Sequence, residues 1–232
     1  MKSFRHNLIE VKGPKVHSES IAGTRFYFNE DDPTSGPYPS VTSILKSPEK
    51  EAGLQAWRDK IGNAEATKIS RQAACRGNRV HLTMENYILG KPDEGFMGED
   101  AKGISIQIKK LADKHVDNIR AVEQPLWSDF LRVAGTPDLV ADWNGRISII
   151  DWKNSIGSKK EEYIHDYFIQ EAAYAVMWEE NTGIPIDQLV TVIGNLEGAP
   201  QVFINKRDDW MPSFLQLREE FDLRLVETLA SS

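Results

Sequence analysis

The pattern of apolar and polar positions divides the chain into a helical first half and a mixed second half. Residues up to about Lys46 are irregular, with one predicted strand at 24–28 and the start of a helix near Thr42. Three further helices are predicted, at 51–61, 64–89 and 101–115. Residues 93–100 are expected to form the loop between the last two of them.

After residue 115 the pattern changes to short apolar runs with turn signals between them. Strands are predicted over 119–129, 130–143 and 146–155, and a later hairpin over 188–206 turns at Glu197-Gly198. Asn144-Gly145, between the second and third strands, is a strong signal for a tight hairpin. Helices are predicted over 161–182 and 210–229, the last with Leu217, Phe221 and Leu225 on one face. This order of elements predicts an α/β fold with a sheet flanked by helices.

Composition fits one soluble globular domain. The chain has 232 residues, of which 40% are hydrophobic and 27% are charged. No apolar run approaches the ~20 residues of a membrane-spanning helix, and the start has no apolar signal-peptide core. Cys75 is the only cysteine, so an intramolecular disulfide and a cysteine-rich metal site are excluded. We therefore expect an intracellular, cytoplasmic protein with no membrane partner.

The net charge of −7 is unevenly distributed along the chain. Residues 1–120 contain 19 Lys and Arg against 16 Asp and Glu, whereas residues 121–232 contain 9 against 19. A basic surface for nucleic acid is therefore compatible with the first half, although the whole chain is acidic. A chance imbalance in a chain with this many charged residues is the alternative interpretation.

Two aspartates interrupt apolar runs on either side of the predicted turn. Asp138 lies six residues before Asn144-Gly145 and Asp151 lies six residues after it, so an antiparallel hairpin would bring them opposite each other. Facing residues on one side of a sheet have Cβ atoms only ~4.5–5.5 Å apart. Carboxylates this close repel each other, and a divalent cation between them removes the repulsion.

Lys153 follows Asp151 by two residues, so strand alternation places both side chains on the same face. An ammonium beside a metal ion can orient an attacking water or neutralise charge that develops on a phosphate. A pair of aspartates, a metal and a lysine together are suited to phosphodiester hydrolysis. The alternative is an ion-pair ladder on a solvated edge hairpin, but the apolar run before Asp151 favours a buried strand.

The sequence of Pro137-Asp138 followed by Asp151-Trp152-Lys153 resembles the signature motif of the PD-(D/E)XK nuclease superfamily. Longer segments are similar to its RecB-like branch, which includes the mitochondrial genome maintenance exonucleases and their phage relatives. These segments are PSVTSIL (39–45), RGNRVHLTMENYILG (76–90), GTPDLV (135–140), IIDWKNS (149–155) and IQEAAYAVMWEENTG (169–183). The resemblance covers about residues 38–206.

This resemblance implies a restriction-endonuclease-like core, in which a central mixed β-sheet is flanked by helices. We expect one nuclease domain over residues 1–232. Within it, residues 1–60 are an N-terminal strand and helix extension, residues 61–206 are the core, and residues 207–232 are a C-terminal amphipathic helix.

The metal ligands are also implied by the resemblance. His81 and Glu85 share one helix face. On residue pattern alone a histidine packed in the core is the commoner interpretation of His81. The RecB-like branch uses a helix histidine as a metal ligand, which implies a Mg²⁺ or Mn²⁺ site made by His81, Asp138, Asp151 and the carbonyl of Trp152. Glu85 is expected to bind a second metal or to shape the site.

Two residues of the helix after Lys153 are expected to act in catalysis by the same resemblance. Gln170 and Tyr174 are four positions apart and form the Gln…Tyr pair that closes over the active site in RecB-like nucleases. Gln170 would bond the scissile phosphate or Lys153, and Tyr174 would hold a phosphate oxygen. A polar residue near a helix start and a packed tyrosine are the alternative.

Contacts to DNA are expected from the first half of the chain. Lys68, Arg71, Arg76 and Arg79 fall on one arc of the long helix and could follow a phosphate backbone, although each is also typical of a solvated face. Ser40 and Thr42 are possible phosphate contacts, with Thr42 favoured as a helix cap. Trp57 is more typical of a core residue than of a base-stacking one. Glu123 is interpreted as a charge at a strand edge, rather than as part of the metal site.

The sequence therefore predicts a metal-dependent DNA exonuclease acting at free, single-stranded ends. No GxxxxGK[ST] loop is present, so no nucleotide cofactor or motor is expected. The nuclease is free-standing or is recruited by replication or recombination proteins, and a phage or bacterial origin is favoured. The alternatives are a structure-selective or sequence-specific endonuclease of the same fold, a non-catalytic DNA-binding module, and a structural protein whose acidic hairpin is only surface.

Overall fold

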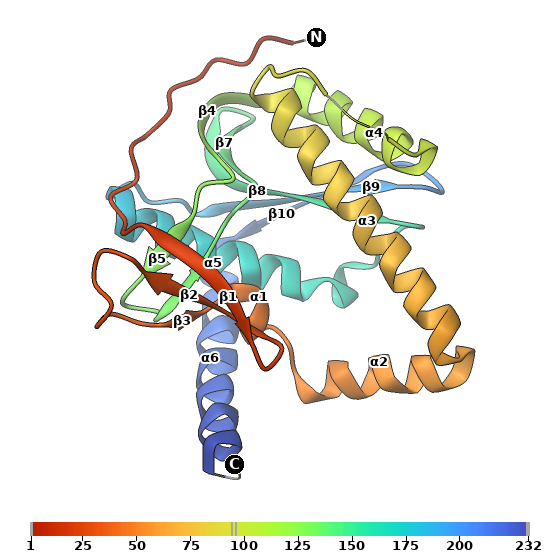
Figure 1. Ribbon diagram of the computed structural model, residues 1–232. Helices are drawn as coiled ribbons and strands as arrows, with labels where there is room; N and C mark the ends of the chain where they lie inside the picture. Colours follow the sequence, from red (N-terminus) through yellow and green to blue (C-terminus); the bar gives the residue numbers. More distant parts are fainter. Residues whose placement is uncertain (1, 94, 96, 231–232) are drawn as a thin grey trace.

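A five-stranded mixed sheet forms the centre of the computed structural model, which describes residues 2–93, 95 and 97–230 (Figure 1). The strand order is β10-β9-β8-β7-β4. The strands are β4 (Val116–Val122), β7 (Leu139–Trp143), β8 (Arg146–Ser155), β9 (Gln188–Asn195) and β10 (Gln201–Lys206). β8 and β9 run parallel, while the other neighbouring pairs run antiparallel.

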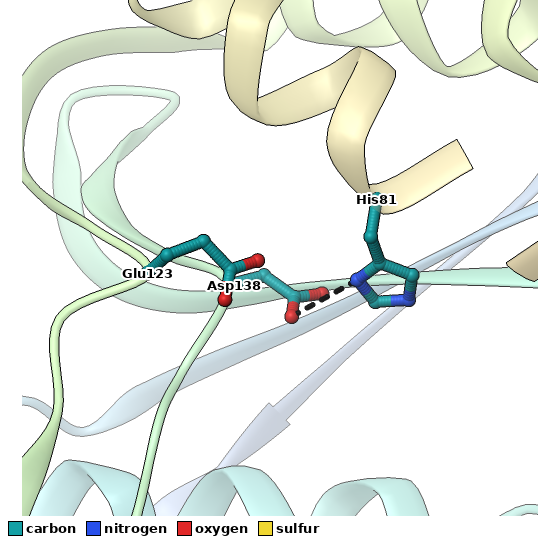
Figure 2. A group of neighbouring side chains, drawn as sticks. All are labelled: His81, Glu123 and Asp138. Atoms are coloured by element: carbon teal, nitrogen blue, oxygen red, sulfur yellow. Dashed lines mark ion pairs between the residues drawn. The ribbon is translucent and has the colours of Figure 1, made fainter. Parts of the chain in front are cut away.

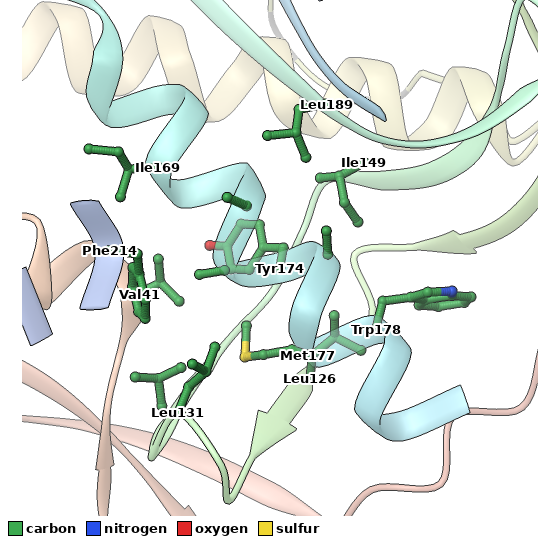
Figure 3. Packing of buried hydrophobic residues seen from close by; sticks show 14 of the residues in the cluster. Val41, Leu126, Leu131, Ile149, Ile169, Tyr174, Met177, Trp178, Leu189 and Phe214 are labelled. Atoms are coloured by element: carbon green, nitrogen blue, oxygen red, sulfur yellow. The ribbon is translucent and has the colours of Figure 1, made fainter. Parts of the chain in front are cut away.

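Helices cover both faces of this sheet. Helices α3 (Asn63–Ile88) and α4 (Glu99–His115) pack on the face that includes Ile150, and α5 (His165–Thr182) packs on the face that includes Ile149. Figure 3 shows the side chains of α5 around Ile149. Because Ile149 and Ile150 point to opposite faces, β8 is buried on both sides, as its continuous apolar run predicts. The predicted α/β class with a central mixed sheet flanked by helices is confirmed.

The hairpin between β7 and β8 forms at the predicted turn. Asn144 and Gly145 have φ angles of 54° and 80°, the left-handed backbone that this type of tight turn requires. The register then runs from Trp143 opposite Arg146 to Leu139 opposite Ile150. One further step along the register brings Asp138 opposite Asp151, as the sequence predicted.

Two of the predicted strands are each divided by a break. The strand expected over 119–129 is divided at Glu123 into β4 and β5 (Leu126–Ser128), and that over 130–143 into β6 (Val133–Gly135) and β7. Proline explains both breaks, because it has no N–H to donate to a ladder and restricts the residue before it. Pro125 lies in the first break and Pro137 in the second. β5 and β6 pair with each other outside the central sheet.

A second small sheet, of three strands, lies beside the β5–β6 pair. Its strands are β1 (Val16–Ile21), β2 (Thr24–Asn29) and β3 (Tyr38–Pro39), in that order. Only β2 was expected from the sequence. The sequence of β1 lacks the alternation of apolar and polar residues from which a strand is predicted, and in the structure the strand is almost wholly exposed. A bridge from Ser40 to Ala134 joins this sheet to β6.

Helix α2 (Pro48–Ile61) extends away from the body of the protein (Figure 1). It begins three residues earlier than predicted, with Ser47 as its N-cap and Pro48 in its first turn. None of its side chains is buried. The Lys50 Nζ lies 2.6 Å from Asp166 Oδ2, an exposed ion pair that ties the start of α2 to the start of α5.

The remaining helices differ little from prediction. The helix α1 (Val41–Ile44) is short, η1 (Glu161–Tyr163) precedes α5, and α6 (Arg207–Ala230) packs against α5. The helix predicted over 161–182 therefore begins at His165 instead. The loop predicted over 93–100 includes positions 94 and 96, which lie outside the described residues. Within the described part of the chain, no helix has the length and apolar character needed to cross a membrane.

Candidate active site

Three carboxylates and a lysine meet where β4, β7 and β8 leave regular pairing. The last register pair of β4 and β7 is Val122 with Leu139, so the next step brings Glu123 opposite Asp138. The N–H of Glu123 donates to the carbonyl oxygen of Asp138 at 3.1 Å, which fixes this step. Asp151 follows in the same row on β8. Residues in one row of a sheet point to one face, so these carboxylates converge.

His81 completes this group from α3 (Figure 2). Its Nδ1 lies 3.2 Å from Asp138 Oδ1. Val80 and Met84, on the same turn of helix, are fully buried against the sheet and hold the helix there. Burial alone lowers the pKa of His81, but the charge and hydrogen bond of Asp138, with the charge of Asp151, raise it to about 9. Without a metal, this histidine is a cation paired with Asp138.

Asp138 is the most strongly anchored of the carboxylates. Its Oδ2 accepts a hydrogen bond of 2.8 Å from the backbone N–H of Trp152. Burial alone raises the pKa of Asp138, but His81, Lys153 and this N–H together hold it below its ordinary value. Asp138 is therefore ionised at neutral pH. Trp152 contacts the group through this N–H, and its carbonyl remains a predicted ligand.

Asp151 and Lys153 form a buried ion pair beside Asp138. The Nζ of Lys153 lies 2.5 Å from Asp151 Oδ2, as strand alternation predicted. Burial lowers the pKa of Lys153, but Asp151 and Asp138 raise it above its ordinary value, so the amine stays protonated. Burial and the neighbouring Asp138 raise the pKa of Asp151 in spite of this partner. Removing either residue would leave an uncompensated charge in the interior.

Glu123 belongs to this group, and the interpretation of it as a strand-edge charge is wrong. His81, Glu123 and Asp138 each offer one ligand atom, and the three atoms lie within 4.8 Å of one another. Burial and the charge of Asp138 raise the pKa of Glu123 to about 8, although the neighbouring His81 lowers it. Carboxylate oxygens are donors that suit Mg²⁺ or Mn²⁺, and the imidazole nitrogen adds a donor of the kind that transition-metal ions prefer. The donor set therefore fits a divalent cation.

One signal in the sequence marks Glu123, although it is not specific: Pro125, two residues later, limits the strand. In the structure Glu123 also has a φ of 46°, which is rare for a residue other than glycine. Glu85, which was predicted as a ligand, is outside the group of His81, Glu123 and Asp138, but its charge contributes to the raised pKa of Glu123. Glu85 therefore contributes to the electrostatic field at Glu123.

Gln170 and Tyr174 lie together on α5, with Tyr174 packed in the core (Figure 3). Gln170 Nε2 donates to the hydroxyl of Tyr174 at 3.0 Å. Tyr174 is 3% exposed, and its ring lies against Gly135, where an added Cβ would be 2.7 Å from Tyr174 Cε1. The contact of Tyr174 with a phosphate oxygen stays a prediction. The hydroxyl of Tyr174 accepts the hydrogen bond from Gln170, which is only partly buried.

Glu171 is a buried carboxyl that the sequence did not single out. It is fully buried on α5, and its Oε1 accepts a hydrogen bond from the hydroxyl of Thr191. Its Oε2 has no hydrogen-bond partner among the described residues. Burial and the charge of Asp151 raise the pKa of Glu171 well above its ordinary value. Thr191 pairs with Asp151 in the sheet register. The neutral carboxyl of Glu171, bonded to Thr191, therefore lies one strand away from Asp151.

Of the basic residues on α3 that were predicted to contact DNA, two are exposed and two are bonded to other residues of the protein. Lys68 is exposed and lies near Glu65, and Arg71 is also exposed. Arg76 Nε donates to Asn154 Oδ1 at 3.0 Å, which links α3 to β8 directly after Lys153. Arg79 Nη2 lies 2.6 Å from Asp93 Oδ1. Arg76 and Arg79 thus have structural partners, which a phosphate contact would have to replace.

The residues of α1 and α2 differ from prediction in two respects. Ser40, not Thr42, is the cap of α1, because its hydroxyl accepts from the N–H of Ser43. Thr42 lies inside the helix and its Oγ1 accepts from Arg25 Nη2 at 3.2 Å. Trp57 is half-buried on α2, which buries no side chain, so the interpretation of it as a core residue is wrong.

Sequence comparison finds relatives with a consistent name. Proteins named mitochondrial genome maintenance exonuclease 1 match from Xenopus tropicalis, at 25% identity over 182 residues, and from Homo sapiens, at 25% over 177. The chain is similar to the mitochondrial genome maintenance exonucleases. The matches cover 72% and 70% of this chain, and it spans about half the length of those relatives. The resemblance to PD-(D/E)XK nucleases indicated by the motifs is confirmed.

Family models and solved structures were also compared with the chain. No family model matches the chain. A crystal structure of an Eubacterium rectale protein, provisionally named an exonuclease, aligns with a TM-score of 0.45 and 14% sequence identity. That alignment covers 65% of this chain and 66% of the other.

Proposed function

We propose that the chain is a metal-dependent DNA exonuclease that hydrolyses phosphodiester bonds at single-stranded ends. The observation that carries this proposal is the convergence of His81, Glu123 and Asp138 beside the ion pair of Asp151 and Lys153. A divalent ion would meet three ligand atoms there, next to a protonated amine. The names of the relatives support a nuclease, and specifically one that requires a DNA end.

The metal site would be made by His81, Glu123 and Asp138, with Asp151 and the carbonyl of Trp152 as further candidate ligands. Mg²⁺ or Mn²⁺, when bound, supplies Lewis-acid polarisation of a phosphoryl oxygen and favours deprotonation of the attacking water. The fit rests on charge as well as on distance. Carboxyls whose pKa values are raised by mutual repulsion and burial are stabilised as anions when a cation arrives.

Lys153 would act on the reacting phosphate through its protonated Nζ. A buried ammonium that is already oriented needs little reorganisation to stabilise charge developing on a phosphate oxygen or to orient the attacking water. Asp151 holds this amine, and Gln170, oriented by Tyr174, would donate a hydrogen bond to the same phosphate. These roles explain why polar groups accumulate on an otherwise apolar sheet.

The DNA strand would approach along α3. Lys68 and Arg71 are exposed, and Arg76 and Arg79 lie farther along the same helix. The first 120 residues have a net positive charge, although the whole chain has a charge of −7. Binding that rests on phosphate contacts should weaken steeply with salt. We further propose that the nuclease works without a nucleotide cofactor, in the cytoplasm, alone or with replication or recombination proteins.

The experiment that tests this function compares linear and circular single-stranded DNA. End-labelled linear DNA and closed circles are incubated with Mg²⁺ or Mn²⁺, with EDTA as a control. Lys153→Ala should lose activity by about 10²-fold or more. Lys206→Ala, on an exposed lysine of β10, is the matched control and should keep full activity.

Each outcome leads to a different conclusion. Degradation of the linear form alone, lost with EDTA and with Lys153→Ala, supports the exonuclease. Cleavage of the circle would replace it with an endonuclease of the same fold. Full activity of Lys153→Ala in a clean preparation would refute the proposed chemistry, and binding of DNA without cleavage would indicate a non-catalytic module.

A further inference from the structure

The active-site lysine has a second neighbour besides its carboxylate partner. The Nζ of Lys153 lies over the ring of Tyr167, 5.0 Å from the ring centroid. This distance is within the range in which an ammonium is attracted to the face of an aromatic ring. The side chain of Lys153 is 18% exposed, so the attraction acts in a partly desolvated place where it is stronger than at an open surface.

Tyr167 is itself held firmly. It lies in the first turn of α5 and packs against the buried cluster of Ile164, Phe168 and Ile193. Ile193 is the residue of β9 that pairs with Lys153 in the register of the sheet. The ring therefore packs against the cluster that contains the residue beside the lysine, which limits its freedom to move away from Lys153.

A ring suits this position better than another carboxylate would. Glu123, Asp138 and Asp151 already place three carboxyl groups in the site, and a further one would raise the repulsion that opposes their ionisation. An aromatic face attracts the ammonium through its quadrupole and adds no charge. It also keeps holding the amine when a metal ion competes with Lys153 for Asp151.

We propose that Tyr167 is a positioning residue whose ring holds Lys153 in its reactive orientation. The inference rests on the proposed nuclease function and adds to it a residue of α5 that lies outside the signature motif. The ring is the active part of Tyr167. Among the described residues no hydrogen bond involves its hydroxyl, so phenylalanine can replace tyrosine without loss of the contact to Lys153.

The test compares turnover of three variants on single-stranded DNA with saturating Mn²⁺. Tyr167→Leu removes the ring and should lower kcat by about 2- to 30-fold, which corresponds to the ~0.5–2 kcal/mol of a cation–π contact. KM should stay within about twofold, because the ring acts on the lysine and not on the DNA. Tyr167→Phe should restore kcat to the wild-type value.

Tyr163→Leu is the matched control. Tyr163 is an exposed tyrosine four residues earlier, and its ring also has a lysine over it, Lys160, at 5.9 Å. Losing this pair should leave kcat unchanged. If Tyr167→Leu does not fold, Tyr167→Met takes its place, since the flexible methionine side chain can fill the space against the same buried cluster without providing a ring.

A second measurement does not depend on activity. The ε-methylene protons of Lys153, assigned by comparison with Lys153→Arg, should be shifted upfield by the ring current in the wild type and in Tyr167→Phe, but not in Tyr167→Leu. Normal kcat in Tyr167→Leu, or an unshifted wild-type resonance, would overturn the inference and leave the nuclease proposal intact. An inactive wild-type protein with the shift present would refute the nuclease function and the positioning role with it, while the contact itself would stand.

Discussion

Glu123 and Asp138 face each other where β4 and β7 stop pairing, and the N–H of Glu123 donates to the Asp138 carbonyl at 3.1 Å. This backbone bond joins two segments whose side chains would otherwise repel. A residue at a strand edge would be free to turn its carboxylate to solvent. Glu123 is instead partly buried beside His81, and this brings the two carboxylates into one group.

Loss of Glu123 should therefore weaken metal binding. Glu123→Gln keeps the shape of the side chain and removes one anionic ligand, so the affinity for Mn²⁺ should fall by about tenfold or more. Titration calorimetry measures this directly. Glu162→Gln, on an exposed glutamate of η1, is the matched control. Equal affinity in Glu123→Gln and wild type would remove Glu123 from the ligand set.

Metal binding should release protons. At neutral pH, His81, with a pKa of about 9, and Glu123, with a pKa of about 8, both carry a proton that a metal ion must displace. Up to about two protons should be released per ion, and the affinity for Mn²⁺ should rise steadily from about pH 6 to about pH 9. Calorimetry in buffers of different ionisation enthalpy counts these protons. A heat that is independent of the buffer would contradict the prediction.

The buried Glu171 should make stability depend on pH. Its pKa is raised in the folded protein, so it contributes stability below its unfolded pKa of about 4.5 that is lost as the pH rises through the folded value. Glu171→Gln keeps an acceptor for Thr191 and cannot ionise. Its melting temperature should exceed that of wild type at about pH 8, by about 2–4 °C for each kcal/mol, and match it near pH 4. Thermal unfolding at both pH values tests this, and a lower melting temperature at the higher pH would count against it.

Position 135 should tolerate no side chain, because Gly135 lies against the ring of Tyr174. In Gly135→Ala the new Cβ would lie 2.7 Å from a ring atom of a tyrosine fixed in the core. Overpacking of this kind costs about 1–3 kcal/mol in the free energy of unfolding. Gly103→Ala is the control, because Gly103 is an exposed position within α4 with open space around it and should gain about 0.5–1 kcal/mol. Urea unfolding of both variants gives the comparison, and equal stability of Gly135→Ala and wild type would show that Tyr174 can move.

The hairpin of the active site could be predicted because its determinants are local. Asn144-Gly145 defines the turn, and counting outward from a tight turn brings Asp138 opposite Asp151. Alternation along one strand then places Lys153. Each of these steps involves neighbours in the sequence, so a single chain is enough to make them.

Glu123 and the small sheet could not be predicted, because their positions depend on distant segments. Periodicity describes how a strand alternates, but it does not indicate where pairing with another strand ends. Pro125 and Pro137 mark the breaks at Glu123 and before Asp138, but that β5 and β6 then pair with each other outside the central sheet is a long-range feature. Tyr167 gave no signal for the same reason, since its role depends on the register of β8 against β9.

Helix α2 has a consequence for the motions of the protein. In the part of the chain that the structure describes, it buries no side chain, and an exposed ion pair between Lys50 and Asp166 ties its start to α5. Such a pair is worth ~0–1 kcal/mol, so the amides of α2 should exchange with solvent through frequent local opening. Those of β8, paired on both sides, should exchange only when the whole sheet unfolds. The 14 residues of α2 can therefore open and re-form many times within the lifetime of one folded core.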